Sequence, residues 1–90
     1  MTCYVDELRH YPGHRSGHQH WCHLVSDGGE PELHGFAARL GLRREWFQAR
    51  SRHPHYDLPP AGRERAIELG AVPVSSRELI RLLRRARAAG

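Results

Sequence analysis

Apolar and polar positions alternate with the two-residue period of a strand in two short segments near the start of the chain. Residues 3–6, CYVD, alternate and are rich in residues that favour strands. Residues 21–25, WCHLV, alternate as well, so their odd and even positions face opposite sides of a sheet. One face of this second strand carries Trp21, His23 and Val25, and the other carries Cys22 and Leu24. We predict a strand over each segment.

A helix is predicted between Pro31 and Gly41. Its apolar residues recur with the i, i+3, i+4, i+7 spacing of a single helical face, and they are Leu33, Phe36, Ala37 and Leu40. Proline is favoured at the first position of a helix and glycine just beyond its end. We expect this helix to bury one face against the core.

Two further helices are predicted in the second half of the chain. The first begins at Pro60 and is ended by Gly70. The second begins after Ser75, and Ser75 and Glu78 have the spacing of a capping box. Over residues 76–90 it combines an apolar stripe with arginines, so it is a basic C-terminal helix. Its apolar stripe is Leu79, Ile80, Leu82, Leu83 and Ala86.

Short extended segments are predicted between the helices. Residues 44–48, REWFQ, are predicted as a third strand, and residues 49–54 as a basic loop. Residues 55–58, HYDL, are expected to be extended because Leu58 precedes a proline, which disfavours the helical conformation.

The order of these elements predicts the class of fold. Residues 71–74, AVPV, are an edge strand, since proline cannot donate a hydrogen bond to a neighbouring strand. Strands interleaved with helices are typical of α/β or α+β folds, in which helices cover a sheet. We predict one small layered domain over residues 1–90, with a short mixed sheet and about three helices.

Several of these segments resemble, in the same order, a family of small bacterial and phage proteins catalogued as a domain of unknown function. The shared motifs are YVDELR, CHLVSD, ELHGFAARLGLRREWFQ, HYDL and RAIELGAV. The resemblance covers roughly residues 4–78 and leaves the C-terminal helix mostly outside. It implies a shared fold and carries no activity. The residues that it implies belong to the family pattern are Asp6, Cys22, His23, Asp27, His34, Trp46, Gln48, His55, Tyr56 and Asp57.

The loop predicted over residues 9–20 is rich in histidine. Together with Cys22 and His23, its histidines suggest a zinc site, because imidazole and thiolate are preferred zinc ligands. Their spacing is not that of a zinc finger, however, and the family pattern does not include the loop histidines. We therefore interpret them as part of a solvated polar loop that binds metal weakly. They are His14, His18 and His20.

Three histidines elsewhere in the chain are better candidates for a functional site. His23, His34 and His55 each lie at or near the end of a predicted element, and the carboxylates of Asp6, Asp27 and Asp57 accompany them. Imidazoles and carboxylates together hold zinc or another divalent metal. They also make a metal-free acid–base site, in which histidine carries the proton and aspartate fixes its tautomer. Taken singly, each histidine is more simply a hydrogen-bonded structural residue.

From these alternatives we predict two overlapping sets of site residues. The predicted metal ligands are His23, His34, His55 and Asp6, and the predicted catalytic residues are His23, His34, His55 and Asp57. Catalysis by a cysteine nucleophile is weakly supported, because adjacent residues on a strand point to opposite faces, which separates Cys22 from His23. Cys3 lies in an apolar stretch and is predicted to be in the core.

Arginine alone supplies the 14 basic residues of the chain, whose formal net charge is +4. Guanidinium groups suit phosphate or carboxylate partners. The basic residues Arg43, Arg44, Arg50 and Arg52 flank Trp46 and Phe47, and such a mixture is typical of single-stranded nucleic-acid sites. The alternative, which we prefer for Trp46 and Phe47, is that both rings are in the core and the arginines line its rim.

No segment approaches the length of about 20 apolar residues that a membrane span needs, and the first residues lack the pattern of a secretion signal. We expect a cytoplasmic protein without membrane contact.

The predicted function is hydrolysis of phosphate esters or nucleic acid with a divalent metal such as zinc, although the sequence leaves open whether the protein is an enzyme. The alternative is a non-catalytic module that binds nucleic acid, a phosphorylated ligand or a protein through its arginines. A homo-oligomer is compatible with either function.

Overall fold

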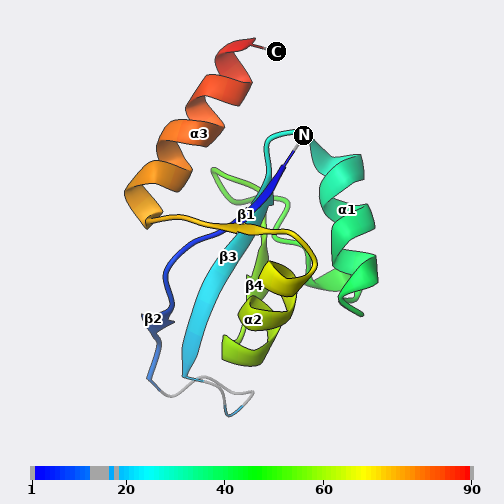
Figure 1. The fold of residues 1–90 in the computed structure, drawn as a ribbon, viewed down its shortest axis with the longest axis vertical. Helices are drawn as coiled ribbons and strands as arrows, with labels where there is room; N and C mark the ends of the chain where they lie inside the picture. Colours follow the sequence, from blue (N-terminus) through cyan, green and yellow to red (C-terminus); the bar gives the residue numbers. More distant parts are fainter. Residues whose placement is uncertain (1, 13–16, 18, 90) are drawn as a thin grey trace.

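The computed structural model describes residues 2–12, 17 and 19–89. Within them, a mixed five-stranded sheet lies between helices on its two faces (Figure 1). The prediction of a small layered domain with a mixed sheet and three helices is confirmed. None of the helices in this part of the chain is both long and apolar enough to cross a membrane.

The central strand of the sheet is β3, His20–Ser26. It pairs antiparallel with β1, Cys3–Val5, and with β4, Tyr56–Leu58. The short β2, Arg9–His10, pairs antiparallel with the beginning of β3, so β2 and β3 form a hairpin. The last strand, β5, Val72–Pro73, runs parallel to β1 at the edge of the sheet, as the proline predicts.

The hairpin corrects the predicted extent of the histidine-rich loop. Arg9 and His10 belong to β2, and β3 already begins at His20, so both ends of the 9–20 segment are strands. The rings of His10 and His20 stack with their centroids 4.9 Å apart on the exposed surface. His14 and His18 lie outside the described residues.

The three helices agree with the apolar pattern. They are α1, Glu30–Arg39, α2, Pro60–Glu68, and α3, Ser76–Ala89. Gly41 and Gly70 follow α1 and α2 with φ angles of +79° and +113°, which L side chains rarely adopt. The Ser75 hydroxyl accepts a hydrogen bond of 3.1 Å from the Glu78 N–H group, which caps α3.

One face of the sheet packs against α1 and α2 and forms the main core. It carries the even-numbered residues of β3 and β4, and Leu33, Ala37 and Ala66 cover it from the two helices. Cys3 is buried there, as predicted. The residues of β3 and β4 that reach this core are Cys22, Leu24, Tyr56 and Leu58.

The opposite face of the sheet lies beneath α3. Val25 of β3 and Leu79 of α3 are both buried, and α3 stands apart from α1 and α2 in Figure 1. His23 is two residues from Val25 and therefore shares this face. The sheet thus separates an apolar core from a second, more polar layer.

The prediction of a strand over residues 44–48 is wrong. Arg44–Trp46 form a 3₁₀ helix, η1, and only Gln48 makes a bridge, to His55. With three residues per turn, the adjacent Trp46 and Phe47 cannot both face the core. Phe47 packs against it, as predicted, but Trp46 is 51% exposed, which contradicts its predicted burial.

Candidate metal centre

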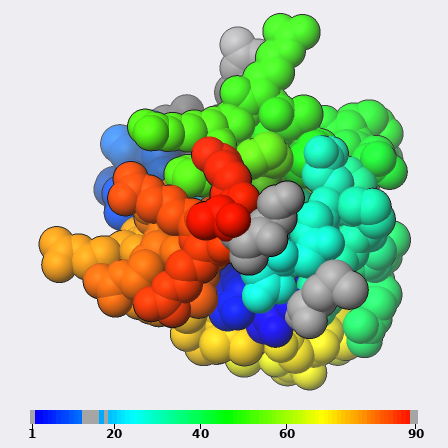
Figure 2. Space-filling model, turned by 90° about the horizontal axis from the view of Figure 1, so that it is seen from above, coloured from blue at the N-terminus to red at the C-terminus, as the bar shows by residue number. Residues whose placement is uncertain are grey.

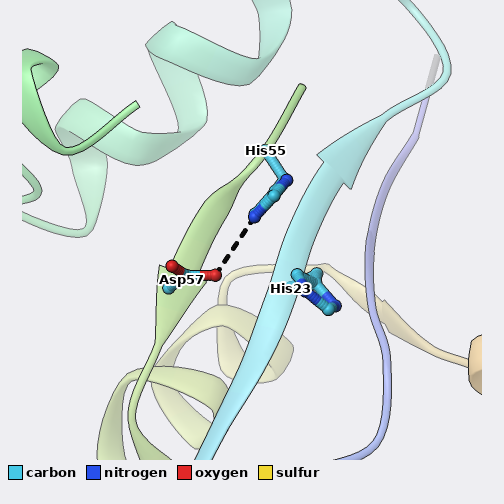
Figure 3. Close-up of side chains that lie close together, drawn as sticks. All are labelled: His23, His55 and Asp57. Carbon is cyan, nitrogen blue, oxygen red and sulfur yellow. Dashed lines mark ion pairs between the residues drawn. The ribbon is translucent and has the colours of Figure 1, made fainter. Parts of the chain in front are cut away.

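His23, His55 and Asp57 lie together on the α3 side of the sheet (Figure 3). The strand register produces this arrangement, because His23 is directly opposite Asp57 in the pairing of β3 with β4. His55 precedes Asp57 by two residues and faces the same way. Each residue offers one ligand atom, and these atoms all lie within 4.8 Å of one another.

Contacts within the group are close. Nε2 of His55 lies 3.2 Å from Oδ1 of Asp57. The rings of His23 and His55 meet edge to face, with their centroids 4.6 Å apart. The Asp57 side chain is 40% exposed, so the group is open to solvent on one side.

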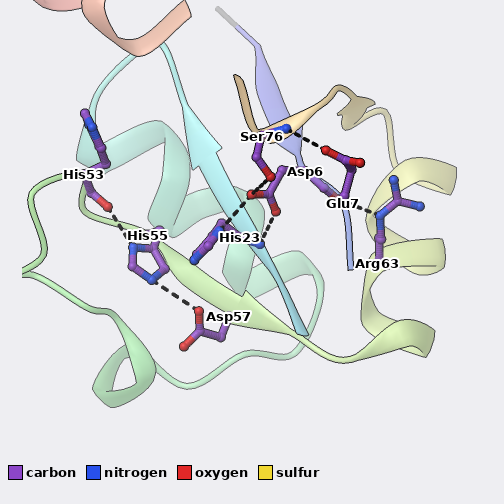
Figure 4. Close-up of polar contacts among 8 residues, drawn as sticks. All are labelled: Asp6, Glu7, His23, His53, His55, Asp57, Arg63 and Ser76. Atoms are coloured by element: carbon purple, nitrogen blue, oxygen red, sulfur yellow. Dashed lines mark hydrogen bonds and ion pairs between the residues drawn. The ribbon is translucent and has the colours of Figure 1, made fainter. Parts of the chain in front are cut away.

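Both histidines are held through Nδ1 by an oxygen acceptor (Figure 4). Nδ1 of His55 lies 2.7 Å from the His53 carbonyl oxygen, which can only accept, so this nitrogen carries a hydrogen. Nδ1 of His23 lies 2.8 Å from Oδ2 of Asp6. The Nε2 atoms are then the lone-pair nitrogens of the neutral rings.

Asp6 is a buried residue that positions His23 from behind. Its side chain lies where the pairing of β1 with β3 is displaced, since Val5 pairs with Leu24 but Arg9 pairs with Trp21. Three residues between these pairs on one side thus lie opposite two on the other, which is a bulge of the kind that re-aims side chains.

The Asp6 carboxylate is fully engaged. Its Oδ1 accepts a hydrogen bond of 2.6 Å from the His23 N–H group, and its Oδ2 accepts one of 3.2 Å from the Ser76 hydroxyl. Burial by itself would raise the pKa of Asp6, but hydrogen bonds from His23 and Ser76 hold that pKa below its ordinary value. Asp6 therefore orients the imidazole of His23, and its oxygens are turned away from the group that it was predicted to join as a ligand.

The pKa values of His55 and His53 are shifted in opposite directions. Burial opposes a charge on His55, but hydrogen bonds to Asp57 and to the His53 carbonyl raise the pKa of His55 above its ordinary value. Burial and the positive charges of Arg87, Arg52 and Arg84 lower the pKa of His53. The field around this group therefore changes from negative at Asp57 to positive beside α3.

His34 lies on the other face of the sheet and does not join His23 and His55. Its Nδ1 is hydrogen-bonded to the Tyr56 hydroxyl at 2.8 Å, and its ring packs edge to face against Phe47. Tyr56 lies between His55 and Asp57 on the strand, so its side chain points to the opposite face of the sheet. Its hydrogen bond with His34 is therefore on the side of the main core.

The remaining candidates have structural contacts. Asp27 accepts hydrogen bonds from the Thr2 N–H group at 2.7 Å and from the Tyr4 hydroxyl at 3.2 Å, which fixes the start of β1. Burial raises the pKa of Cys3 to about 11 and that of Cys22 to about 12. Both thiols thus stay protonated and are poor nucleophiles at neutral pH.

The predicted arginine cluster is divided between two regions. Arg43 lies over the Trp46 ring at 5.9 Å and Arg44 belongs to η1, which packs beside α1. Arg52 lies on the α3 side, where its carbonyl accepts a hydrogen bond from Arg87. Arg50 lies in the exposed turn that precedes it.

A cavity of about 240 Å³ opens between the sheet and α3, with His23, His53 and His55 in its wall. Sequence reasoning missed that Ser76 and His53 belong here. Ser76 is read from the sequence only as part of a helix cap, and His53 only as part of a basic loop. No local pattern indicated that they line the same cavity as His23, which is more than 25 residues away in each case.

A family model described as "Protein of unknown function (DUF4031)" matches residues 3–86. This match includes most of α3, which the motif resemblance left largely outside. No curated protein matches the chain, and no solved structure does.

Proposed function

This chain belongs to the DUF4031 family of proteins of unknown function, and we propose that it binds a divalent transition metal, zinc first among them, and hydrolyses phosphate esters with it. The proposed ligands are Nε2 of His23, Nε2 of His55 and a carboxylate oxygen of Asp57. The observation that carries this proposal is the pair of imidazoles whose Nδ1 atoms are both held by oxygen acceptors. Histidines that ligate metals almost always have their second nitrogen held in this way.

The separation of two of the ligand atoms supports a small tetrahedral ion. Ligands at 2.0–2.1 Å from zinc stand about 3.3 Å apart when the geometry is tetrahedral. Nε2 of His55 and Oδ1 of Asp57 are 3.2 Å apart, and the remaining ligand atom lies within 4.8 Å. His23, held by Asp6, would supply the third ligand of this set.

Three protein ligands leave a fourth position for water, which is the arrangement of catalytic zinc sites. A metal held by His23, His55 and Asp57 would lower the pKa of a water molecule and polarise the phosphoryl group. Hydrolysis would then join the oxygen of a water molecule to phosphorus as the ester P–O bond breaks, and the released alkoxide would take up a proton. The cavity beside the ligands and the arginines of α3 favour a phosphate substrate, because guanidinium groups bind phosphate oxygens in pairs.

A metal-free acid–base site is a second candidate, and the Asp6–His23 pair favours it. A buried carboxylate at Nδ1 fixes the tautomer of the imidazole and leaves Nε2 to accept a proton. The two candidates differ in their need for metal. Only the first loses its activity on chelation.

Metal titration of the whole chain tests the proposal. Protein purified without a tag or metal resin should bind one zinc ion with high affinity in calorimetry, and His55→Ala should weaken that affinity by 100-fold or more. His20→Ala is the matched control, since His20 is an exposed histidine of the hairpin. Hydrolysis of a chromogenic phosphodiester should stop with chelator and return with zinc. If His20→Ala abolishes binding while His55→Ala retains it, the proposal is wrong.

A further inference from the structure

A groove lined with arginine runs along α3, next to the proposed metal site. It has a volume of about 740 Å³, and no acidic side chain is found among the described residues that line it. Figure 2 looks down on α3, whose side chains project outward from the body of the molecule. The arginines of the groove are Arg9 from β2 and Arg77, Arg81, Arg84 and Arg85 from α3.

The groove and the cavity beside the metal ligands are neighbours. Arg9, Ser76 and Ile80 line both of them. Ser76 also donates its hydroxyl hydrogen to Asp6, the residue that holds His23. A ligand lying in the groove would therefore lie next to the cavity that His23 and His55 line.

We propose that this groove binds the sugar–phosphate backbone of a nucleic-acid strand and leads one of its phosphates to His23, His55 and Asp57. The cleavage of that phosphate rests on the proposed function, whereas the binding of the strand does not. The substrate is then a polynucleotide and the bond that is hydrolysed is an internal phosphodiester.

The length of the groove argues for a chain of phosphates over a single one. Arg77 and Arg85 are eight positions apart, which is about 12 Å along a helix with a rise of 1.5 Å per residue. One phosphate group cannot span guanidinium groups at both ends of that distance. Arg81 pairs with Glu78 at 3.3 Å, and the other four arginines with one bound phosphate would still leave most of their charge unneutralised.

The chemistry of the lining argues for recognition of the backbone only. Apart from arginine, the described lining residues are Ser76, Ile80 and Ala88, so the groove offers no aromatic surface on which bases stack. Phosphate contacts alone carry no sequence information. Binding should therefore be insensitive to sequence and steeply dependent on salt, because each neutralised phosphate releases counterions.

Fluorescence anisotropy of labelled 16-nucleotide DNA and RNA strands tests the groove, with EDTA present so that no metal contributes. The test variant is Arg77→Gln/Arg85→Gln, because neither arginine forms an ion pair within the described residues. The control is Arg39→Gln/Arg65→Gln, which makes the same charge change on α1 and α2, where the exposed ion pair of Arg65 with Glu68 contributes little. Poly-glutamate of equal charge is the competing polyanion.

The wild-type protein should bind at least one of the strands, and the groove variant should lower the slope of log K against log salt by about 1.4, from two lost contacts. That difference corresponds to about 25-fold weaker binding at 0.1 M salt, and the control variant should bind as the wild type does. Equal losses in both double variants, or no binding at 50 mM salt, would overturn the proposal. Poly-glutamate that competes as well as the strand does would also overturn it, in favour of an acidic protein partner.

The two proposals fail separately. Strand binding that persists in EDTA while zinc titration shows no site would leave the groove intact and remove hydrolysis. Zinc binding without strand binding would leave the metal site and restrict its substrate to small phosphate esters.

Discussion

At the scale of single residues, Asp6 connects the strands, α3 and the candidate site. Its backbone carbonyl accepts a hydrogen bond of 2.8 Å from Nε of Arg63, while its carboxylate binds His23 and Ser76. Asp6 is only 2% exposed. If its carboxylate were removed, His23 and Ser76 would each lose a hydrogen-bond partner that water cannot replace. Asp6 was predicted as a site residue from its position at the end of a predicted strand. Its role in orienting His23 was not predictable, because no sequence pattern indicates the bulge that turns Asp6 inward.

Replacing Asp6 should destabilise the fold in a manner that depends on pH. Asp6→Asn should cost about 2 kcal/mol at pH 7, because charge-assisted hydrogen bonds are lost. The folded-state pKa of Asp6 is lower than the ordinary 3.8, so its contribution is complete above that value and is lost as the pH falls through the folded pKa. Urea unfolding should show a large difference from wild type at pH 7 that shrinks towards pH 2. A difference that stays constant over this range would contradict the assignment of charge to Asp6.

The proton on His55 should compete with a bound metal. The pKa of His55 is raised above the ordinary 6.5, so the ring keeps its proton to a higher pH than an isolated histidine does. Metal needs the lone pair on Nε2, so zinc affinity should fall by about tenfold per pH unit below that raised pKa. Competition with a coloured chelator at pH 6, 7 and 8 measures this dependence. Asp57→Asn removes the carboxylate that raises the pKa, although it also weakens zinc binding at every pH, so the shape of the pH curve is the informative quantity.

At the scale of elements, α3 completes the candidate site and holds to the sheet by few groups. Leu79 is buried, the Ser76 N–H group donates to Glu7 at 3.0 Å, and Arg87 donates to the Arg52 carbonyl at 3.2 Å. The pattern of the sequence was sufficient to predict α1, α2 and α3. An apolar stripe marks α1 and α3, whereas α2 is marked by the proline at its start and the glycine after its end. The strand prediction for residues 44–48 was wrong because a segment this short, with two adjacent aromatic side chains, has no hydrophobic periodicity that distinguishes a strand from a helical turn.

Leu79→Ala should loosen α3 and destabilise the protein. A buried leucine truncated to alanine costs about 2–5 kcal/mol through lost transfer energy and a residual cavity. Since Leu79 packs on the α3 side of the sheet, the loss should appear first as hydrogen exchange in residues 76–89 and as weaker strand binding by the groove. Leu8→Ala is a suitable comparison, because Leu8 is an exposed hydrophobic residue and its loss should change stability by less than about 0.5 kcal/mol. Equal effects of the two substitutions would mean that α3 does not depend on Leu79.

At the scale of the whole molecule, the candidate site exists because two segments distant in the sequence, β3 and β4 with the residue before it, share one face of a sheet. Local periodicity predicted β3 and the shared face of His23 and Val25, and these predictions are confirmed, whereas the strand predicted over residues 44–48 is not formed. It could not predict that β4 pairs with β3 so that Asp57 lies opposite His23, because pairing is a long-range property. His34 shows the same limit. Its predicted place in the first half of α1 is correct, but no local pattern indicates which face of the sheet α1 covers.

The tripeptide His55-Tyr56-Asp57 spans the sheet, with its middle side chain in the core and its outer two at the candidate site. This alternation constrains which insertions and deletions the chain tolerates. One residue added between Gln48 and β4 can be absorbed by the exposed turn. One residue added inside the tripeptide would exchange the two faces, burying a carboxylate and exposing a tyrosine. A library of single-residue insertions should therefore be depleted sharply at positions 55–57 and hardly at all at positions 49–52.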